Sequence, residues 1–99
     1  MDLTDDQQQR ISAWAQATPY VRAVHLFGSK AKGNARPDSD VDLAVSAAGG
    51  HYTALAAEWE KHLSDCTGLT VNIRDYDRNK AIRDACAECP VVIYERADG

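Results

Sequence analysis

The sequence lacks the features that mark exported and membrane proteins. Its three cysteines are an odd number and give no paired disulfide framework. No apolar run approaches the roughly 20 residues that a membrane span needs. The first residues are acidic and polar, unlike a secretory signal. We therefore expect reduced thiols and a cytoplasmic protein that does not enter a membrane.

Positive charge is also scarce. Eleven lysines and arginines against fifteen acidic residues give a net charge of −4, which argues against direct nucleic-acid binding through a basic face. Three of the basic residues, Lys30, Lys32 and Arg36, gather in one short stretch. Such local charge fits a triphosphate better than a polymer, although solvated loop charges would give the same pattern.

The remaining composition is that of an ordinary folded protein. Hydrophobic residues make up 44% and charged residues 26% of the 99 residues, with no repeat and no linker. A chain of this length buries one core, so we expect a single domain over residues 1–99. Little of it is left for a separate lobe that would grip an acceptor substrate.

Hydrophobic periodicity alternates between helix and strand along the chain. Thr4 and Gln7 have the spacing of a helix capping box, and Pro19, Gly68 and Pro90 end periodic segments. The pattern predicts helices over 4–17, 51–66 and 77–88, and strands over 20–27, 41–46, 69–74 and 91–94. This order predicts an α/β fold, with helices packed against a mixed sheet.

The residues that carry chemistry begin where the first expected strand ends. Gly28 can take a backbone conformation that is closed to residues with a side chain. The amides after it can point at an anion from the start of a helix. Ser29 adds a hydroxyl and Lys30 adds a positive charge. The pattern predicts a phosphate-binding turn.

A pair of aspartates follows Ser29 after ten intervening residues. If Val41 begins a strand, the carboxylates of Asp40 and Asp42 lie on one face while Val41 and Leu43 enter the core. Backbones about 7 Å apart let both acids bind one divalent cation, or two cations about 3.5–4 Å apart. Oxygen ligands with open positions favour Mg²⁺ over zinc. The turn and the acid pair together predict a binding site for a metal-bound nucleoside triphosphate.

Gly28-Ser29, ten residues and Asp40-x-Asp42 resemble the signature of the nucleotidyltransferases of the DNA polymerase beta superfamily. The short chain is similar to the minimal nucleotidyltransferase branch, whose members pair as antitoxins with small helical HEPN-domain toxins. The resemblance implies a polymerase-beta-like fold in which Asp40 and Asp42 are catalytic and hold Mg²⁺, and Gly28, Ser29 and Lys30 bind ATP. It also implies transfer of AMP to a hydroxyl, a tyrosine of the HEPN toxin, within a hetero-oligomer.

One position departs from the family pattern. A third acid usually arrives on the strand after the second long helix, where this chain has Asn72, a weaker metal ligand that is no base. Losing a positioned general base typically costs 10²–10⁴-fold in rate. Asp75 and Asp77 are near in sequence, but on a regular strand Asp75 faces away from Asn72. The alternatives are a weak or inactive module that neutralises its partner by binding, and a subunit of a two-chain enzyme that acts on a small molecule.

For several other residues, two interpretations stay open. Cys86 and Cys89 have the CxxC spacing, but a zinc or redox role would need further ligands or another fold, and the inner face of a helix accounts for them. His25 either lines the pocket or is a structural histidine. Arg74 shares the face of Asn72 and either touches a phosphate or forms a surface ion pair.

Overall fold

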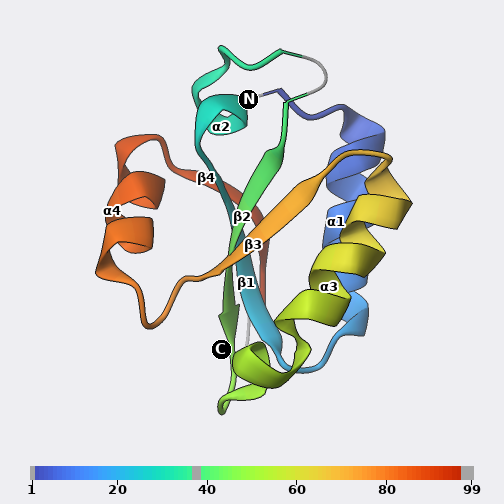
Figure 1. Cartoon of the computed structure of the whole chain (residues 1–99), viewed down its shortest axis with the longest axis vertical. Coiled ribbons are helices and arrows are strands. Elements are labelled where there is room, and N and C mark those ends of the chain that lie inside the picture. Colours follow the sequence, from blue (N-terminus) through green and yellow to red (C-terminus); the bar gives the residue numbers. More distant parts are fainter. Residues whose placement is uncertain (1, 37–38, 97–99) are drawn as a thin grey trace.

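A computed structural model describes residues 2–36 and 39–96, which form four helices and four strands (Figure 1). The predicted elements are all present, and a one-turn helix follows Gly28. The helices are α1 (Asp5–Ala17), α2 (Ser29–Lys32), α3 (His51–Thr67) and α4 (Lys80–Glu88). The strands are β1 (Val21–Phe27), β2 (Val41–Ala47), β3 (Val71–Asp75) and β4 (Val91–Glu95).

The strands form one mixed sheet, as predicted, in the order β3-β2-β1-β4. Strand β1 is antiparallel to both β2 and β4, whereas β2 and β3 are parallel and are joined through α3. A parallel pair needs such a long crossover, because its second strand must start at the same end as the first. The first residues of β2 and β3 therefore lie at one end of the sheet.

The core lies between the sheet and the helices α1 and α3, which share one side of it, while α4 lies on the other side (Figure 1). Along β2 the alternate residues Val41, Leu43 and Val45 are fully buried in this core. Trp14 and Trp59 pack edge to face at 5.7 Å between the two helices. Because strand residues alternate, the even-numbered residues of β2 face away from this core.

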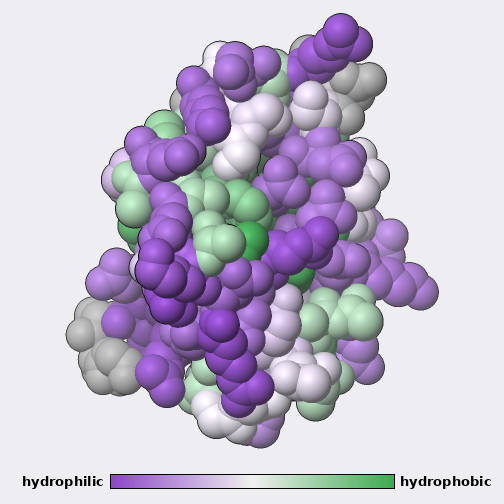
Figure 2. All heavy atoms as spheres, turned by 60° about the vertical axis from the view of Figure 1, so that its left-hand side comes forward, coloured by the Kyte–Doolittle hydropathy of each residue, from purple (hydrophilic) through white to green (hydrophobic). Residues whose placement is uncertain are grey.

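The side of the sheet that carries α4 is only partly covered. Figure 2 shows hydrophobic residues reaching the surface here, bordered by hydrophilic ones. Helix α4 contacts β1 and β2, and its Cys86 is buried. Cys89 is half-buried and its thiol donates to the carbonyl of Ala31 at 3.1 Å. Both cysteines are free, and their surroundings agree with the packing interpretation.

Helix α1 begins with the predicted capping box. The Thr4 hydroxyl accepts from the Gln7 amide at 3.1 Å, and the Gln7 side chain accepts from the Thr4 amide at 3.0 Å. At the other end of α1, the Arg96 guanidinium donates to the carbonyls of Ala15 and Thr18 at 3.4 and 3.3 Å. The helix is thus fixed to the sheet at the end of β4.

Residues 77–79 were expected to start the last helix, and this was wrong. The Asp75 carboxylate accepts from the amides of Asp77 and Arg78 at 3.1 and 3.4 Å, which makes a turn after β3. Asn79 then caps α4 by accepting from the Ile82 amide at 3.3 Å. Aspartate and asparagine favour such local bonds over continuing a helix. Among the described residues, no helix is both long enough and apolar enough to cross a membrane.

Candidate functional site

The aspartate pair lies at the start of β2, on the side of the sheet away from the main core. Val41 and Leu43 are fully buried, as the strand pattern predicted. Asp42 is half-buried, and Asp40, just before the strand, is exposed. Both carboxylates contact the same neighbouring side chain, Asn72. The two acids therefore converge on one point, which solvent reaches from the side of Asp40.

Asn72 occupies the position beside the acid pair because β2 and β3 run parallel, with Asp42 opposite Asn72. Its Nδ2 donates to Asp40 Oδ2 at 3.2 Å and to Asp42 Oδ1 at 3.4 Å. The family resemblance implied that Asn72 stands where a third acid is usual. The two hydrogen bonds that join it to both acids come from the structure.

The Gly28-Ser29 turn approaches Asp42 from the side of β1. Phe27 pairs with Asp42 across β1 and β2, so the turn begins next to this carboxylate. Gly28 has a φ of 77°, and a Cβ placed on it would lie 2.6 Å from Asp42 Oδ2. Only glycine fits there, because a side chain would be strained and would also displace the carboxylate. Ser29 is exposed at the first position of α2.

Lys30, predicted to bind phosphate, has only 2% of its surface exposed. The chain start lies across α2: the Asp2 amide donates to the Lys30 carbonyl at 2.8 Å, and Asp2 Oδ2 accepts from the Ala35 amide at 2.9 Å. Lys32 is more exposed and lies 3.5 Å from Glu88 of α4. Ser29 is thus more accessible than Lys30, and phosphate contacts by either residue stay predictions.

The electrostatic setting of Asp42 suits a cation. Burial raises the pKa of the Asp42 carboxyl above its usual value, and the charge of Asp40 adds to this effect. The hydrogen bond from Asn72 and the charge of Arg74 oppose it. Arg74 is exposed, and its Nη1 donates to the carbonyl of Ile73 at 2.9 Å. A partly buried carboxylate beside another is stabilised in its charged form when a cation binds between them.

The donor set fits a single hard cation. Among the described residues, no group of three or more His, Cys, Asp or Glu side chains converges on a point, so Asp40 and Asp42 stand as a pair. Two carboxylates with open positions suit Mg²⁺, which keeps water and substrate phosphates among its ligands. Asp75 caps the turn after β3, and Asp77 accepts from the Ser46 hydroxyl at 2.8 Å. Neither of them reaches the pair.

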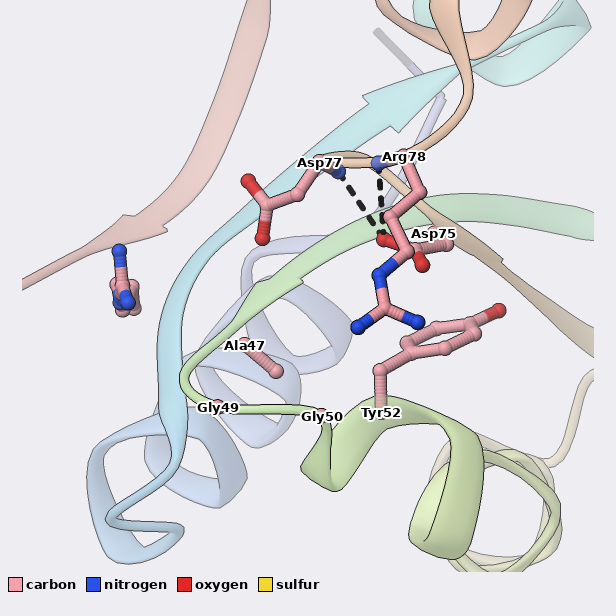
Figure 3. A pocket seen from close by; sticks show the side chains of 8 residues that line it. Ala47, Gly49, Gly50, Tyr52, Asp75, Asp77 and Arg78 are labelled. Atoms are coloured by element: carbon pink, nitrogen blue, oxygen red, sulfur yellow. Dashed lines mark hydrogen bonds between the residues drawn. The ribbon is translucent and has the colours of Figure 1, made fainter.

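A cavity of about 430 Å³ lies at the other end of the sheet (Figure 3). In Figure 3 the Arg78 side chain points toward the Tyr52 ring, across from Gly49 and Gly50. Asp42 and Ala47 are five residues apart on β2, which is about 17 Å along a strand. The cavity is therefore separate from the acid pair, and no local motif signals it. Its lining residues are Arg22, Ala47, Gly49, Gly50, Tyr52, Asp75, Asp77 and Arg78.

His25 lies between these two regions, opposite Ala44 of β2. Its ring stacks on Tyr76 at 4.3 Å, with 11° between the planes. Burial lowers the pKa of His25 below its usual value, while the charges of Glu95 and Asp77 oppose the shift. The stacked ring of His25 thus packs between β1 and the turn after β3.

Comparison with known proteins places the chain in a family. The family model described as Polymerase beta, Nucleotidyltransferase matches residues 9–99. No curated protein sequence matches the chain significantly.

Solved structures share the fold. One described as a toxin-antitoxin with AMP-PNP has a TM-score of 0.74 and 18% identity, covering 97% of this chain and 77% of the other. A complex from Shewanella oneidensis, of a tri-AMPylated HEPN toxin with its MNT antitoxin, has a TM-score of 0.66 and 18% identity, covering 93% and 75%. A structure assigned to a minimal nucleotidyltransferase has a TM-score of 0.67 and 25% identity, covering 86% and 87%. The chain belongs to the polymerase beta nucleotidyltransferase family, and its Gly28-Ser29 turn and its Asp40 and Asp42 lie at one end of the mixed sheet.

Proposed function

We propose that this protein is a Mg²⁺-dependent nucleotidyltransferase that transfers AMP from ATP to a tyrosine hydroxyl of a HEPN-domain toxin, and so acts as its antitoxin in the cytoplasm. The observation that carries the proposal is the contact of the Gly28 turn with Asp42, whose Oδ2 leaves no room for a Cβ on Gly28. This contact unites a phosphate-binding turn and a cation-binding pair in one site.

The chain's own residues account for the binding steps. The amides after Gly28 and the Ser29 hydroxyl donate to phosphate oxygens of ATP, at the start of α2. Asp40 and Asp42 would hold Mg²⁺ beside them. When bound, the cation neutralises charge on the α-phosphate and orients the attacking oxygen. Positioning and electrostatics supply most of the catalysis in such a site.

The transfer of AMP needs no reactant besides ATP and the acceptor hydroxyl. The acceptor oxygen bonds to the α-phosphorus of ATP, and the bond from that phosphorus to the bridging oxygen breaks. Pyrophosphate leaves with the electron pair, and the phenolic proton passes to solvent. Asn72 has no basic group to take this proton, which favours a slow enzyme.

The acceptor reaches the site from solvent. Asp40 and Ser29 are both exposed, so the end of the sheet that carries them is open to a second protein. The related structures of a tri-AMPylated HEPN toxin with its MNT antitoxin, and of a toxin-antitoxin with AMP-PNP, support a HEPN partner and ATP as donor. The working form is then a hetero-oligomer of the two proteins.

Asn72 supports a second candidate function. Because the third acid is replaced, a module that binds nucleotide weakly and neutralises its toxin by covering it would keep the same fold and the same partner. The two candidates differ in whether inhibition of the toxin needs the aspartates.

A transfer assay separates them. The purified protein is mixed with Mg²⁺, labelled ATP and a HEPN-domain protein encoded beside it, and the label on that partner is measured. We expect label with the native chain and with Asp65→Ala, which removes an exposed acid of α3, and none with Asp40→Ala or Asp42→Ala. Inhibition of the toxin that survives in both site variants, without label, would support the binding module.

A further inference from the structure

Asn72 does something at the acid pair that a carboxylate cannot do. Its Nδ2 donates to Asp40 Oδ2 at 3.2 Å and to Asp42 Oδ1 at 3.4 Å, so one amide group joins two acids that would otherwise repel. An aspartate at this position would add a third negative charge and offer no donor. The pair is therefore held in its convergent arrangement by hydrogen bonds, before any cation arrives.

The amide also divides the oxygens of Asp42 between two sides. Oδ1 is held by Asn72, whereas Oδ2 faces the Gly28 turn, 2.6 Å from where a Cβ on Gly28 would lie. The oxygen on the side of the phosphate-binding turn is thus the one left for a cation. A second cation, on the Asn72 side, would have to compete for oxygens that the amide already occupies.

The charge balance leads to the same conclusion. Two carboxylates neutralise one divalent cation, and two cations in contact need further anionic ligands between them. Asn72 is neutral, and the nearest other acids on β3 and after it, Asp75 and Asp77, are bonded to the turn and to Ser46. No third carboxylate of the described residues reaches the pair.

We propose that this site binds one divalent cation, on the side of the Gly28 turn, and that Asn72 is a positioning residue that holds Asp40 and Asp42 together for it. The inference rests on the proposed function only in taking the acid pair as the cation site. The cation count follows from the side chain at position 72.

The test counts bound Mn²⁺, used in place of Mg²⁺ because free Mn²⁺ is visible by electron paramagnetic resonance. The whole chain is titrated with Mn²⁺ at an equimolar concentration of AMP-PNP, and all Mn²⁺ that is not free is counted as bound to the complex of chain and nucleotide. We expect one Mn²⁺ per native chain and two per Asn72→Asp chain. Asn79→Asp, which adds a carboxylate at the exposed cap of α4, should still bind one.

A second variant tests the positioning role without changing the charge. Asn72→Leu keeps the size of the side chain and removes both hydrogen bonds, so we expect Mn²⁺ affinity at least 10-fold below that of the native chain, with circular dichroism confirming the fold. Two Mn²⁺ per native chain, one per Asn72→Asp chain, or native affinity in Asn72→Leu would overturn the inference. A native chain that binds one Mn²⁺ but transfers no label to the toxin would contradict the proposed activity and would still support this inference.

Discussion

At the scale of single residues, the site depends on a glycine and an aspartate that share one small volume. Gly28 has a φ of 77°, and a Cβ there would lie 2.6 Å from Asp42 Oδ2. The backbone conformation alone would cost a residue with a side chain about 1–2 kcal/mol. A side chain on Gly28 would also displace Asp42, a proposed cation ligand. A substitution of Gly28 should therefore reduce ligand binding more than it reduces stability.

Gly28→Ala is therefore expected to weaken Mg²⁺-ATP binding by more than 10-fold while lowering the free energy of unfolding by about 1–3 kcal/mol. Calorimetric titration and denaturant unfolding measure the two effects. Gly68→Ala is the matched control, because Gly68 has a φ of 73° and nothing within 4 Å of its Cβ position. It should lose similar stability and keep its binding. Equal binding by Gly28→Ala and the native chain would show that the contact is unimportant.

The raised pKa of Asp42 makes a second prediction at this scale. Because its pKa is higher in the folded chain than in the unfolded one, the protonated form favours folding. This contribution is present at low pH and is lost as the pH rises through the folded value. At pH 7 without metal, the charged Asp42 thus lowers stability.

Asp42→Asn should therefore stabilise the metal-free chain at pH 7, by about 1 kcal/mol or less because the side chain is only half-buried. The gain should shrink as the pH approaches 4. Thermal unfolding in EDTA at both pH values measures it, with Asp65→Asn on the exposed face of α3 as control. A variant less stable than the native chain at pH 7 would contradict the argument.

At the scale of elements, α1 depends on its first turn. The hydrogen bonds between Thr4 and Gln7 satisfy two amides that the helix leaves free. Thr4→Ala should cost about 1 kcal/mol and lower the thermal midpoint by about 4–8 °C in a domain of this size. Thr53→Ala, in the exposed part of α3, should change little. Equal midpoints for the two variants would mean that the capping box contributes nothing measurable.

The packing of β1 against the turn after β3 gives a pH dependence. His25 stacks on Tyr76, and its pKa is lower in the folded chain than in the unfolded one, mainly through burial. The neutral form thus favours folding. The contribution is complete above the unfolded pKa of about 6.5 and is lost as the pH falls below it.

His25→Phe keeps a ring against Tyr76 and removes the titration. Between pH 7.5 and 5.5 the variant should lose less stability than the native chain, as measured by urea unfolding at each pH. His62→Gln, at an exposed position of α3, should follow the native chain. Parallel pH profiles for His25→Phe and the native chain would refute the role of His25.

At the scale of the whole molecule, the sequence predicted the helices and strands, because local patterns determine them. The strand segments are alternating or continuously apolar and lie between turn residues, and the long helices have end signals and clear periodicity. The order of helices and strands along the chain, and the mixed sheet, were therefore predicted. The spacing of Gly28, Asp40 and Asp42 indicated a site because glycine permits the turn and the two carboxylates can bind one cation. The helices and strands depend on neighbours within a few residues, and the site motif is a single stretch of fifteen residues.

The rest depends on contacts between distant segments. Lys30 is buried in α2, a helix of four residues that is too short to show periodicity, and the distant Asp2 amide donates to its carbonyl. The last helix starts late because Asp75 caps a turn. The cavity near Tyr52 and Arg78 is lined by segments from β1 to the loop before α4. Pro37 and Asp38, inside the motif, lie outside the described residues.

In the proposed function, the Gly28 turn, Asp40 and Asp42 form one binding site for a cation and a triphosphate. Calorimetric titration of the chain with ATP, in Mg²⁺ and in EDTA, with and without the toxin, tests it most directly. We expect ATP binding that needs Mg²⁺ and is lost in Asp40→Ala and in Asp42→Ala. ATP binding of equal affinity in EDTA, or unchanged in both variants, would contradict it.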